Sequence, residues 1–260
     1  RDVFVAQARE ILGVPVDVVS GREEARLIYQ GAASLLPRSN QRRLVVDIGG
    51  RSTELILGKN LDAHQLQSFQ LGSVTWSMRY FPDNVLSARN FERAEIAAKA
   101  VLDDAATTHG RKQWDQAYGC SGTVGAIADT LLLAERSPAR YQITREGLDW
   151  LRDKLIKAGR FDAIKLEGIK EERKAVIAGG LSVLRALFDL LQIDSLQYAY
   201  GALRHGALYD MLDREQEQTD VRATAVAALA AKFSADAAQG ERVSRAALAL
   251  FDQMAPATLK

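Results

Sequence analysis

Cysteine is nearly absent from this chain, because Cys120 is the only one among its 260 residues. A single thiol excludes a framework of intrachain disulfides and is typical of a protein that works in a reducing cytoplasm. Apolar runs are short as well, and none reaches the roughly 18 residues that a membrane-spanning helix needs. The net charge is only +1, which provides no global basic field for nucleic acid. We therefore expect a cytoplasmic protein that binds neither membranes nor nucleic acid.

Histidine is scarce too, and none of the three stands at metal-ligand spacing from another: His64, His109 and His205. For each of them we expect a surface or packing role. The remaining composition is ordinary, with 47% hydrophobic and 26% charged residues, which is typical of a globular protein. A chain of this length can form one large domain or two medium ones.

The most informative stretch is LVVDIGGRSTELILG, from Leu44 to Gly58. Its pattern predicts a buried strand, a Gly-Gly turn and a second strand, with one carboxylate in each strand. The residues at the tip of this hairpin are Asp47, Gly49, Gly50, Arg51, Ser52, Thr53 and Glu54. Free N–H groups, hydroxyls and carboxylates together can hold a phosphate beside a divalent metal or an attacking water. The alternative is a polar β-turn without a ligand, although an acid at the end of a buried strand is costly unless something uses it.

A helix is predicted from Arg22 to about Leu36, and Glu24 extends its apolar stripe. Glu23, one residue earlier, is turned by about 100° around the helix axis. A carboxylate on the buried face of a first helical turn either satisfies the helix dipole or takes part in function. From the residues alone, both interpretations stay open.

A second candidate anion site follows the strand predicted from Gln116 to Cys120. A glycine-rich turn leads there into an apolar helix, and free N–H groups at the start of such a helix can bind an anion. The residues of this turn are Gly119, Ser121, Gly122 and Thr123.

From Leu44 onward the predicted order is strand, strand, strand, helix, strand, helices, strand, helix. Short turns join the first three strands, which we expect to be antiparallel neighbours, whereas the last two follow helical crossovers and should run parallel. The helix predicted from Glu171 to Leu191 carries a Gly-Gly pair, which we attribute to close helix packing or to a ligand. Further predicted elements are strands at 14–19, 65–71 and 195–200, and helices at 87–108, 144–159, 202–216, 226–233 and 243–254.

Several segments resemble motifs of the exopolyphosphatase/guanosine pentaphosphatase (Ppx/GppA) family: GREEARLI at 21–28, DIGGRSTE at 47–54, GCSGT at 119–123 and GALRHG at 201–206. That family shares its fold with actin, the heat-shock chaperone ATPases and the sugar kinases. The resemblance implies an α/β fold, a ribonuclease H-like lobe of this type, with a short helical C-terminal extension. The chain departs from the family pattern at Arg51, where a third glycine is usual, and at His205, where Glu is usual.

The resemblance also implies an activity, the hydrolytic release of the terminal phosphate from inorganic polyphosphate, from guanosine pentaphosphate or from both. Glu24 matches the family's catalytic carboxylate, and Asp47 and Glu54 would assist it and hold Mg²⁺. The implied phosphate-binding residues are Gly49, Gly50, Arg51, Ser52, Thr53, Gly119, Ser121, Gly122 and Thr123. The implied partners are these phosphate-rich substrates, and a homodimer is one possible assembly.

We divide the chain into the tail of a first ribonuclease H-like lobe (1–33), a second such lobe (34–216) and the start of a C-terminal helical domain (217–260). The family's first phosphate loop, an Asp-x-Gly-Ser-x-Ser pattern, is absent from these residues. We therefore expect a piece of a longer protein that, by itself, lacks half of the phosphate site and is inactive.

Two other classes of function stay open at this point. A non-catalytic module that senses an alarmone or polyphosphate is favoured by Arg51 and by the missing first loop. A kinase of the same fold would need an acceptor pocket, and the Glu-Glu-Ala-Arg segment argues against it, because the matching segment of the sugar kinases is built differently.

Overall fold

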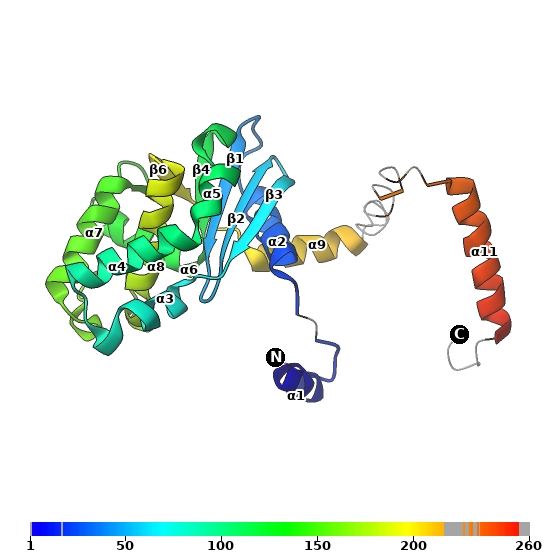
Figure 1. Cartoon of the computed structure of the whole chain (residues 1–260), viewed down its shortest axis with the longest axis horizontal. Coiled ribbons are helices and arrows are strands. Elements are labelled where there is room, and N and C mark those ends of the chain that lie inside the picture. The colour runs from blue at the N-terminus through cyan, green and yellow to red at the C-terminus, as the bar shows by residue number, and fades with distance from the viewer. Residues whose placement is uncertain are drawn as a thin grey trace. The chain divides into compact units, whose positions relative to one another are not determined.

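The strand that carries Asp47 lies inside a six-stranded mixed sheet with the order β3-β2-β1-β4-β6-β5 (Figure 1). The computed structural model describes residues 2–16, 18–215, 226, 229–230, 233 and 235–254. The strands are β1 (Arg42–Ile48), β2 (Thr53–Lys59), β3 (Asp62–Phe69), β4 (Gln116–Cys120), β5 (Gln142–Thr144) and β6 (Ser195–Tyr198). The chain forms two compact units, Arg1–Tyr209 and Asp210–Lys260, and each is described by itself.

The pairing of five strands confirms the predicted order. β1 pairs antiparallel with β2, and β2 with β3, whereas β4 runs parallel to both β1 and β6. The predicted limits were less accurate, because β3 begins at Asp62 rather than Gln65 and β6 ends at Tyr198 rather than Tyr200. β5 was not predicted. This strand of 3 residues pairs antiparallel with β6, and so short a segment shows no alternation in the sequence.

The helices largely follow the prediction. They are α1 (Asp2–Leu12), α2 (Gly21–Ser34), α3 (Ser73–Tyr80), α4 (Ala88–Val101), α5 (Asp103–Thr108), α6 (Ser121–Leu133), α7 (Arg145–Ala158), α8 (Glu171–Leu191), α9 (Leu203–Glu215) and α11 (Ala237–Met254), with short 3₁₀ turns η1 (Pro82–Asn84), η2 (Arg111–Gln113) and η3 (Phe161–Ala163). The side chains of Ser87 and Thr144 cap α4 and α7 by accepting the backbone N–H groups of Asn90 and Gly147. None of the described helices combines the length and apolar character needed to cross a membrane.

Two helical predictions differ from the structure. The continuous helix expected at 87–108 is broken at Leu102, where a tighter turn, closed by the N–H of Ala105 and the carbonyl of Leu102 at 2.8 Å, separates α4 from α5. The helix expected at 226–233 lies mostly outside the described residues.

The strand predicted at 14–19 does not form, because the described residues of this segment pair with no strand of the sheet. A strand needs a neighbour that completes its backbone hydrogen bonds. Here the carbonyl of Val16 accepts a hydrogen bond from the guanidinium of Arg9 at 3.0 Å instead. Val14 and Val19 remain exposed, so these apolar side chains are not buried in a core.

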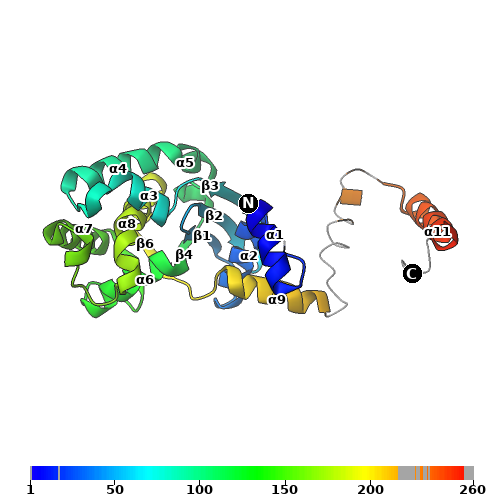
Figure 2. The ribbon, with the colours of Figure 1, turned by 90° about the horizontal axis from the view of Figure 1, so that it is seen from below.

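The two faces of the sheet carry separate cores. Figure 2 shows the helices on both sides of the sheet that cover them. Alternate residues of a strand face opposite sides: Leu44, Val46 and Ile48 of β1 belong to the larger core, to which α3, α4, α6 and α8 contribute. Val45 belongs to the smaller core beneath α2. Asp47 follows Val45 in this alternation, so its side chain lies on the face that α2 covers.

The Gly179-Gly180 pair in α8 confirms the packing explanation. The N–H of Gly179 donates to the Ser77 hydroxyl of α3 at 3.0 Å, and a Cβ at Gly179 would lie 2.4 Å from the backbone nitrogen of Ser77. A Cβ at Gly180 would lie 2.2 Å from the methyl group of Thr123 in α6. Glycine at these positions therefore lets three helices approach one another over the larger core.

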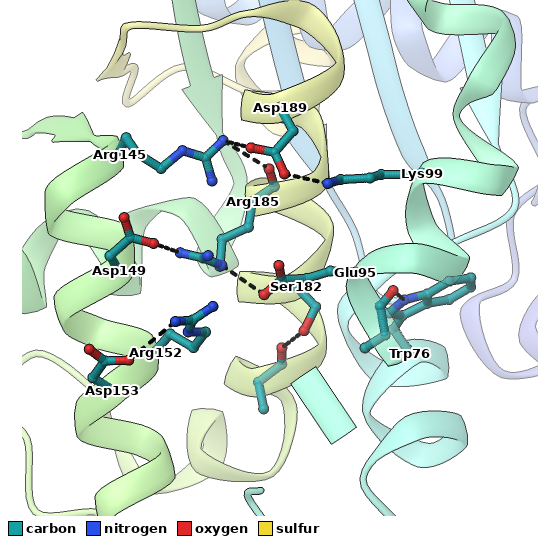
Figure 3. A network of polar contacts seen from close by, with 12 residues as sticks. Trp76, Glu95, Lys99, Arg145, Asp149, Arg152, Asp153, Ser182, Arg185 and Asp189 are labelled. Atoms are coloured by element: carbon teal, nitrogen blue, oxygen red, sulfur yellow. Dashed lines mark hydrogen bonds and ion pairs between the residues drawn. The ribbon is translucent and has the colours of Figure 1, made fainter. Parts of the chain in front are cut away.

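An ion network around the buried guanidinium of Arg185 joins the helices on the outer side of this core (Figure 3). Arg185 of α8 is only 5% exposed and donates to Glu95 of α4 and to Asp149 of α7. One helical turn further, Asp189 pairs with Lys99 of α4. Removing one partner of a buried ion pair costs about 3–5 kcal/mol, so this network fixes how α4 and α7 lie against α8.

Replacing Gly179 with Ala should lower the free energy of unfolding by about 1–3 kcal/mol, the range for overpacking, because the new methyl group has no room beside Ser77. Urea unfolding followed by circular dichroism measures this. The matched control is Gly240→Ala in α11, where nothing lies within 4 Å of an added Cβ and alanine should preserve or raise stability. Equal stability of Gly179→Ala and the wild type would contradict close packing of α3 on α8.

Candidate active site

Four polar side chains form a row across the sheet, one from each of four neighbouring strands: Ser68, Glu54, Asp47 and Cys120. Each is the direct register partner of the next, and directly opposed residues point to the same face. The Ser68 hydroxyl donates to Glu54 Oε1 at 2.8 Å, and the Cys120 thiol donates to Asp47 Oδ2 at 3.3 Å. The hairpin therefore sets the two predicted carboxylates side by side.

Both carboxylates are removed from solvent, with Asp47 7% and Glu54 1% exposed. Burial disfavours the charged form and is the main cause that raises the pKa of Asp47 to about 6 and that of Glu54 to about 7. Hydrogen bonds from the thiol and the serines lower these pKa values, whereas the negative charge of Glu24 raises both. Burial also raises the pKa of Cys120 well above its ordinary value, so the thiol stays protonated and can keep donating to Asp47.

The third predicted carboxylate, Glu24, comes from the first turn of α2. Ser20 caps this helix by accepting the N–H of Glu23 at 3.2 Å. A Cβ at Gly21 would lie 3.1 Å from the Ser68 side chain, so the start of α2 lies directly against β3. Glu24 is half-buried there and close enough for its charge to act on both buried carboxylates. The structure brings the three predicted catalytic carboxylates together, and the division of roles among them stays a prediction.

The loop between β1 and β2 is tied to the start of α3. The backbone N–H groups of Ser73 and Val74 donate to the carbonyls of Gly49 and Gly50 at 2.9 and 3.0 Å. Gly72 permits this approach, because a Cβ there would lie 2.5 Å from the carbonyl carbon of Gly50. The loop therefore keeps its shape through hydrogen bonds that do not depend on a ligand.

Arg51, at the third loop position, is exposed and has a negative φ. The backbone conformation is thus one that any residue adopts, and a side chain in place of the usual glycine brings no left-handed strain. Within the described part of the chain, its guanidinium has no hydrogen bond or ion pair. It is therefore available for a charge-assisted contact with an anion.

The two hydroxyls of this loop are already engaged. Ser52 hydrogen-bonds to Glu54. The hydroxyl of Thr53 donates to the carbonyl of Leu71 at 2.8 Å, and Thr53 is 0% exposed. The phosphate contact predicted for the Thr53 hydroxyl is not available in this arrangement, because the side chain faces the core.

The second predicted turn lies at the same edge of the sheet, because β1 and β4 are parallel neighbours. Ser121 begins α6 with a φ of +87°, a conformation that is uncommon for serine and that concentrates at functional sites. Gly122 is exposed beside it. Gly119 serves packing instead, since a Cβ there would lie 2.6 Å from Leu196.

The nine predicted phosphate-binding residues thus fall into two groups. Those that are exposed or half-buried are Gly49, Gly50, Arg51, Ser52, Ser121 and Gly122. Those that are buried are Thr53, Gly119 and Thr123. The first group lines the two turns, whereas the second supports them from within the fold.

Arg173 is a candidate site residue that was not predicted from the sequence. It stands in the first turn of α8, and its guanidinium lies over Gly122, with Nη2 2.2 Å from where a Cβ would be. In the described part of the chain this guanidinium makes no hydrogen bond or ion pair. No local pattern marks Arg173, because its position depends on how α8 packs against α6.

A mixed sheet of this order, with helices on both faces and two glycine-containing turns at one edge, is the ribonuclease H-like lobe of the actin-type ATPases. Within that class, the chain belongs to the Ppx/GppA phosphatase family, whose model matches residues 1–215. Similar solved structures share this fold. An exopolyphosphatase from Cytophaga hutchinsonii has a TM-score of 0.72 at 23% identity, covering 82% of this chain and 70% of that one. The Aquifex aeolicus family member has a TM-score of 0.65 at 21% identity, with the same coverage of 82% and 70%.

Two curated relatives are similar in sequence over nearly the whole chain. The guanosine-5'-triphosphate,3'-diphosphate pyrophosphatases of Vibrio parahaemolyticus and Vibrio vulnificus are both 40% identical, over 252 and 253 residues, which is 97% of this chain. The alignments cover 50% of each relative. The chain therefore spans about half the length of the curated relatives it matches.

The raised pKa values of Asp47 and Glu54, about 6 and about 7, predict a specific pH dependence of stability. A carboxyl whose folded pKa exceeds its unfolded value contributes stability that is fully present below the unfolded pKa, near 4, and is lost as pH rises through 6 to 7. The free energy of unfolding should therefore fall between pH 4 and pH 7, by up to about 3 kcal/mol for each carboxyl. Urea unfolding at a series of pH values, with a chelator present, measures this.

The control for this prediction is the double variant Asp47→Asn, Glu54→Gln, which keeps both shapes and removes both titrations. It should lose much less stability over the same pH interval. Identical pH profiles for the variant and the wild type would mean that the two carboxyls titrate normally in the folded protein.

Proposed function

We propose that the whole protein is a cytoplasmic, Mg²⁺-dependent hydrolase that releases the terminal phosphate of inorganic polyphosphate, of guanosine pentaphosphate or of both. The observation that carries this proposal is the meeting of three carboxylates with two anion-type turns at one edge of the sheet. The names of the relatives support it, because the matched Vibrio proteins are pyrophosphatases of the guanosine nucleotide and a similar structure is an exopolyphosphatase.

Glu24 would act as the general base. Its carboxylate accepts a proton from the attacking water, the water oxygen bonds to the terminal phosphorus, and the anhydride P–O bond breaks. The shortened phosphate chain leaves with the bonding electron pair as an anion. Phosphoryl transfer depends mainly on positioning and charge neutralisation, and a general base adds about 10²–10⁴-fold.

Asp47 and Glu54 fit a magnesium site. Mg²⁺ is usually bound by one or two carboxylates together with water and substrate phosphate oxygens. Among the described residues, no group of three or more His, Cys, Asp or Glu side chains could hold a metal alone, so substrate and water would complete the coordination. When bound, the ion would neutralise charge on the phosphate oxygens. Because both carboxyls must be ionised to bind a cation, their raised pKa values make metal binding stronger above pH 7 than below it.

The phosphate chain would lie between the two turns. Gly50 and Gly122 expose backbone at the tips of these turns. The guanidinium of Arg173 lies over Gly122, and the exposed Arg51 directly follows Gly50 in the chain. Two cations next to exposed glycines can share the charge of a polyphosphate along its length.

The alternative, a non-catalytic binding module, was favoured by Arg51 in place of a loop glycine. Since Arg51 adopts an ordinary backbone conformation, this departure does not disturb the loop. The three carboxylates that meet beside the loop also have no purpose in a module that only binds polyanions, because like charges would weaken binding.

Glu24→Gln should lower the turnover of polyphosphate or guanosine pentaphosphate by about two to four powers of ten, the range for a general base, with little change in ligand affinity. The rate of phosphate release by the whole protein measures turnover, and calorimetry measures affinity. The matched control is Glu23→Gln, which removes the same charge one residue away from a partly exposed pair with Arg26 and should leave the rate nearly unchanged. A near-normal rate for Glu24→Gln would exclude it as the base.

Arg173→Gln should weaken polyphosphate binding about tenfold, because a charge-assisted hydrogen bond contributes about 1.5–3 kcal/mol. Stability should change little, since the guanidinium has no partner among the described side chains. The control is Lys170→Gln, which removes the same charge from the exposed residue just before α8. Equal losses of affinity in the two variants would indicate a general charge effect rather than a specific contact of Arg173.

A further inference from the structure

Three tyrosines gather beside the end of β6, apart from the proposed catalytic residues: Tyr141, Tyr198 and Tyr200. Their ring centroids lie 5.0 to 6.3 Å apart with planes inclined by 60° to 89°, a geometry that favours edge-to-face contact. The guanidinium of Arg140 lies 5.1 Å from the centre of the Tyr141 ring. Tyr200 is 60% exposed, so this tyrosine cluster presents an aromatic surface to solvent.

The sheet places the tyrosine cluster at the same edge as the two anion-type turns. β6 runs parallel to β4, with Tyr198 opposite Gly119, so the chain leaves β6 where the β4–α6 turn begins. The N–H of Tyr198 donates to the carbonyl of Tyr141 at 3.0 Å and holds these two residues side by side. Tyr141 has a φ of +58°, which is an outlier for a bulky residue and a form of strain that concentrates at functional sites.

One stripe of α6 connects the tyrosine cluster with the second turn. Gly122, Gly125 and Asp129 stand at positions i, i+3 and i+7, which share a helix face. Arg173 lies over Gly122, and the Tyr198 hydroxyl lies over Gly125, 2.9 Å from where a Cβ would be. At a rise of about 1.5 Å per residue, the stripe spans about 10 Å. This span is comparable to a nucleoside with its first phosphates.

Asp129 ends this stripe as an exposed carboxylate, one helical turn beyond Gly125, over which the Tyr198 hydroxyl lies. A hydrogen bond with Tyr141 is the main cause that raises the pKa of Tyr200 to about 12, and the charge of Asp129 adds to it. Burial is the main cause that raises the pKa of Tyr198, and the charge of Asp129 adds there as well. The carboxylate therefore lies within electrostatic reach of the rings.

An exposed tyrosine surface with an arginine on it is suited to a planar heterocycle, because nucleic-acid bases stack on aromatic rings whatever their sequence. The neighbouring carboxylate selects among bases, since an ionised carboxylate only accepts hydrogen bonds. Guanine presents two adjacent donors, the ring N1–H and the exocyclic amino group. Adenine presents one donor and one acceptor on the corresponding edge.

We propose that the tyrosine cluster and Asp129 bind the guanine base of a guanosine 5'-phosphate, whose phosphates extend toward Gly122 and Arg173. This inference rests on the proposed function and deepens it. A guanosine nucleotide would contact both the turns and the tyrosine cluster, whereas inorganic polyphosphate has no base to bind the cluster. Tyr200 supplies the stacking surface and Asp129 accepts from N1–H and the 2-amino group.

The test compares guanosine pentaphosphate with short-chain inorganic polyphosphate by calorimetry, in the whole protein carrying Glu24→Gln so that neither ligand is consumed. Tyr200→Ala should weaken guanosine pentaphosphate binding about tenfold, as expected for loss of one base–aromatic stack, and leave polyphosphate affinity unchanged. Tyr200→Phe keeps the ring and should bind both ligands as before. Asp129→Asn should reduce the preference for GTP over ITP, which lacks the 2-amino group.

The matched control is Tyr80→Ala in α3, which removes a second ring that has an arginine over it, Arg79 at 5.5 Å. It should leave the ratio of the two affinities unchanged. Equal weakening of both ligands by Tyr200→Ala would overturn the proposal, as would unchanged affinity for guanosine pentaphosphate in the Tyr200 and Asp129 variants. A change of oligomeric state on ultracentrifugation with nucleotide affinity intact would overturn it in favour of an interface between copies.

The failure of the proposed function would look different. Suppose that the protein without the Glu24 substitution hydrolyses neither substrate, but Tyr200→Ala selectively weakens the binding of guanosine pentaphosphate. The proposed base site would then be supported and the proposed hydrolase function would be wrong. If hydrolysis proceeds and Tyr200→Ala leaves the KM for guanosine pentaphosphate unchanged, the proposed hydrolase function is supported and the proposed base site is wrong.

Discussion

Two carboxyl groups, Asp47 and Glu54, face each other across neighbouring strands in the interior of the protein, and the rest of the site depends on them. Among the described residues neither has a basic partner: Asp47 accepts a hydrogen bond from the Cys120 thiol, and Glu54 accepts from the hydroxyls of Ser68 and Ser52. Burying them unpaired is unfavourable, as their raised pKa values show. Such a cost is retained where a function uses it, and a cation between the two groups would remove it.

The surrounding fold keeps this pair in place with few degrees of freedom. The larger core and the ion network of Arg185 fix the helices on one face of the sheet. On the other face, α2 packs against the start of α9 so closely that a Cβ at Gly206 would lie 1.8 Å from the carbonyl oxygen of Leu27. Glu24 is thus presented to the buried carboxylates by a helix that cannot shift without breaking backbone contacts. Rigid support of this kind gives a site its precision.

Local signals predicted much of this arrangement, and the errors have a common cause. The hairpin, α7 and α8 follow from short-range patterns, and the structure bears them out. Thr53 was predicted to contact phosphate because it lies beside the loop. In the structure, the alternation of side chains along β2 directs its hydroxyl toward the core. The strand predicted at 14–19 depends on a neighbour that the described residues do not provide, and Arg173 reaches Gly122 only because α8 packs on α6.

The motif resemblance implied the fold class. The residues alone indicated the order of the strands, the hairpin that carries Asp47 and Glu54, and the place of Glu24 on the buried face of its helix. Each of these follows from spacing along the chain, which sets register in a hairpin and direction around a helix. Only the tertiary structure decided which hydroxyls face solvent, where Arg173 lies and that Tyr141 meets Tyr200. Those relations join residues far apart in the sequence, and they arise from the packing of helices and strands, which no local pattern encodes.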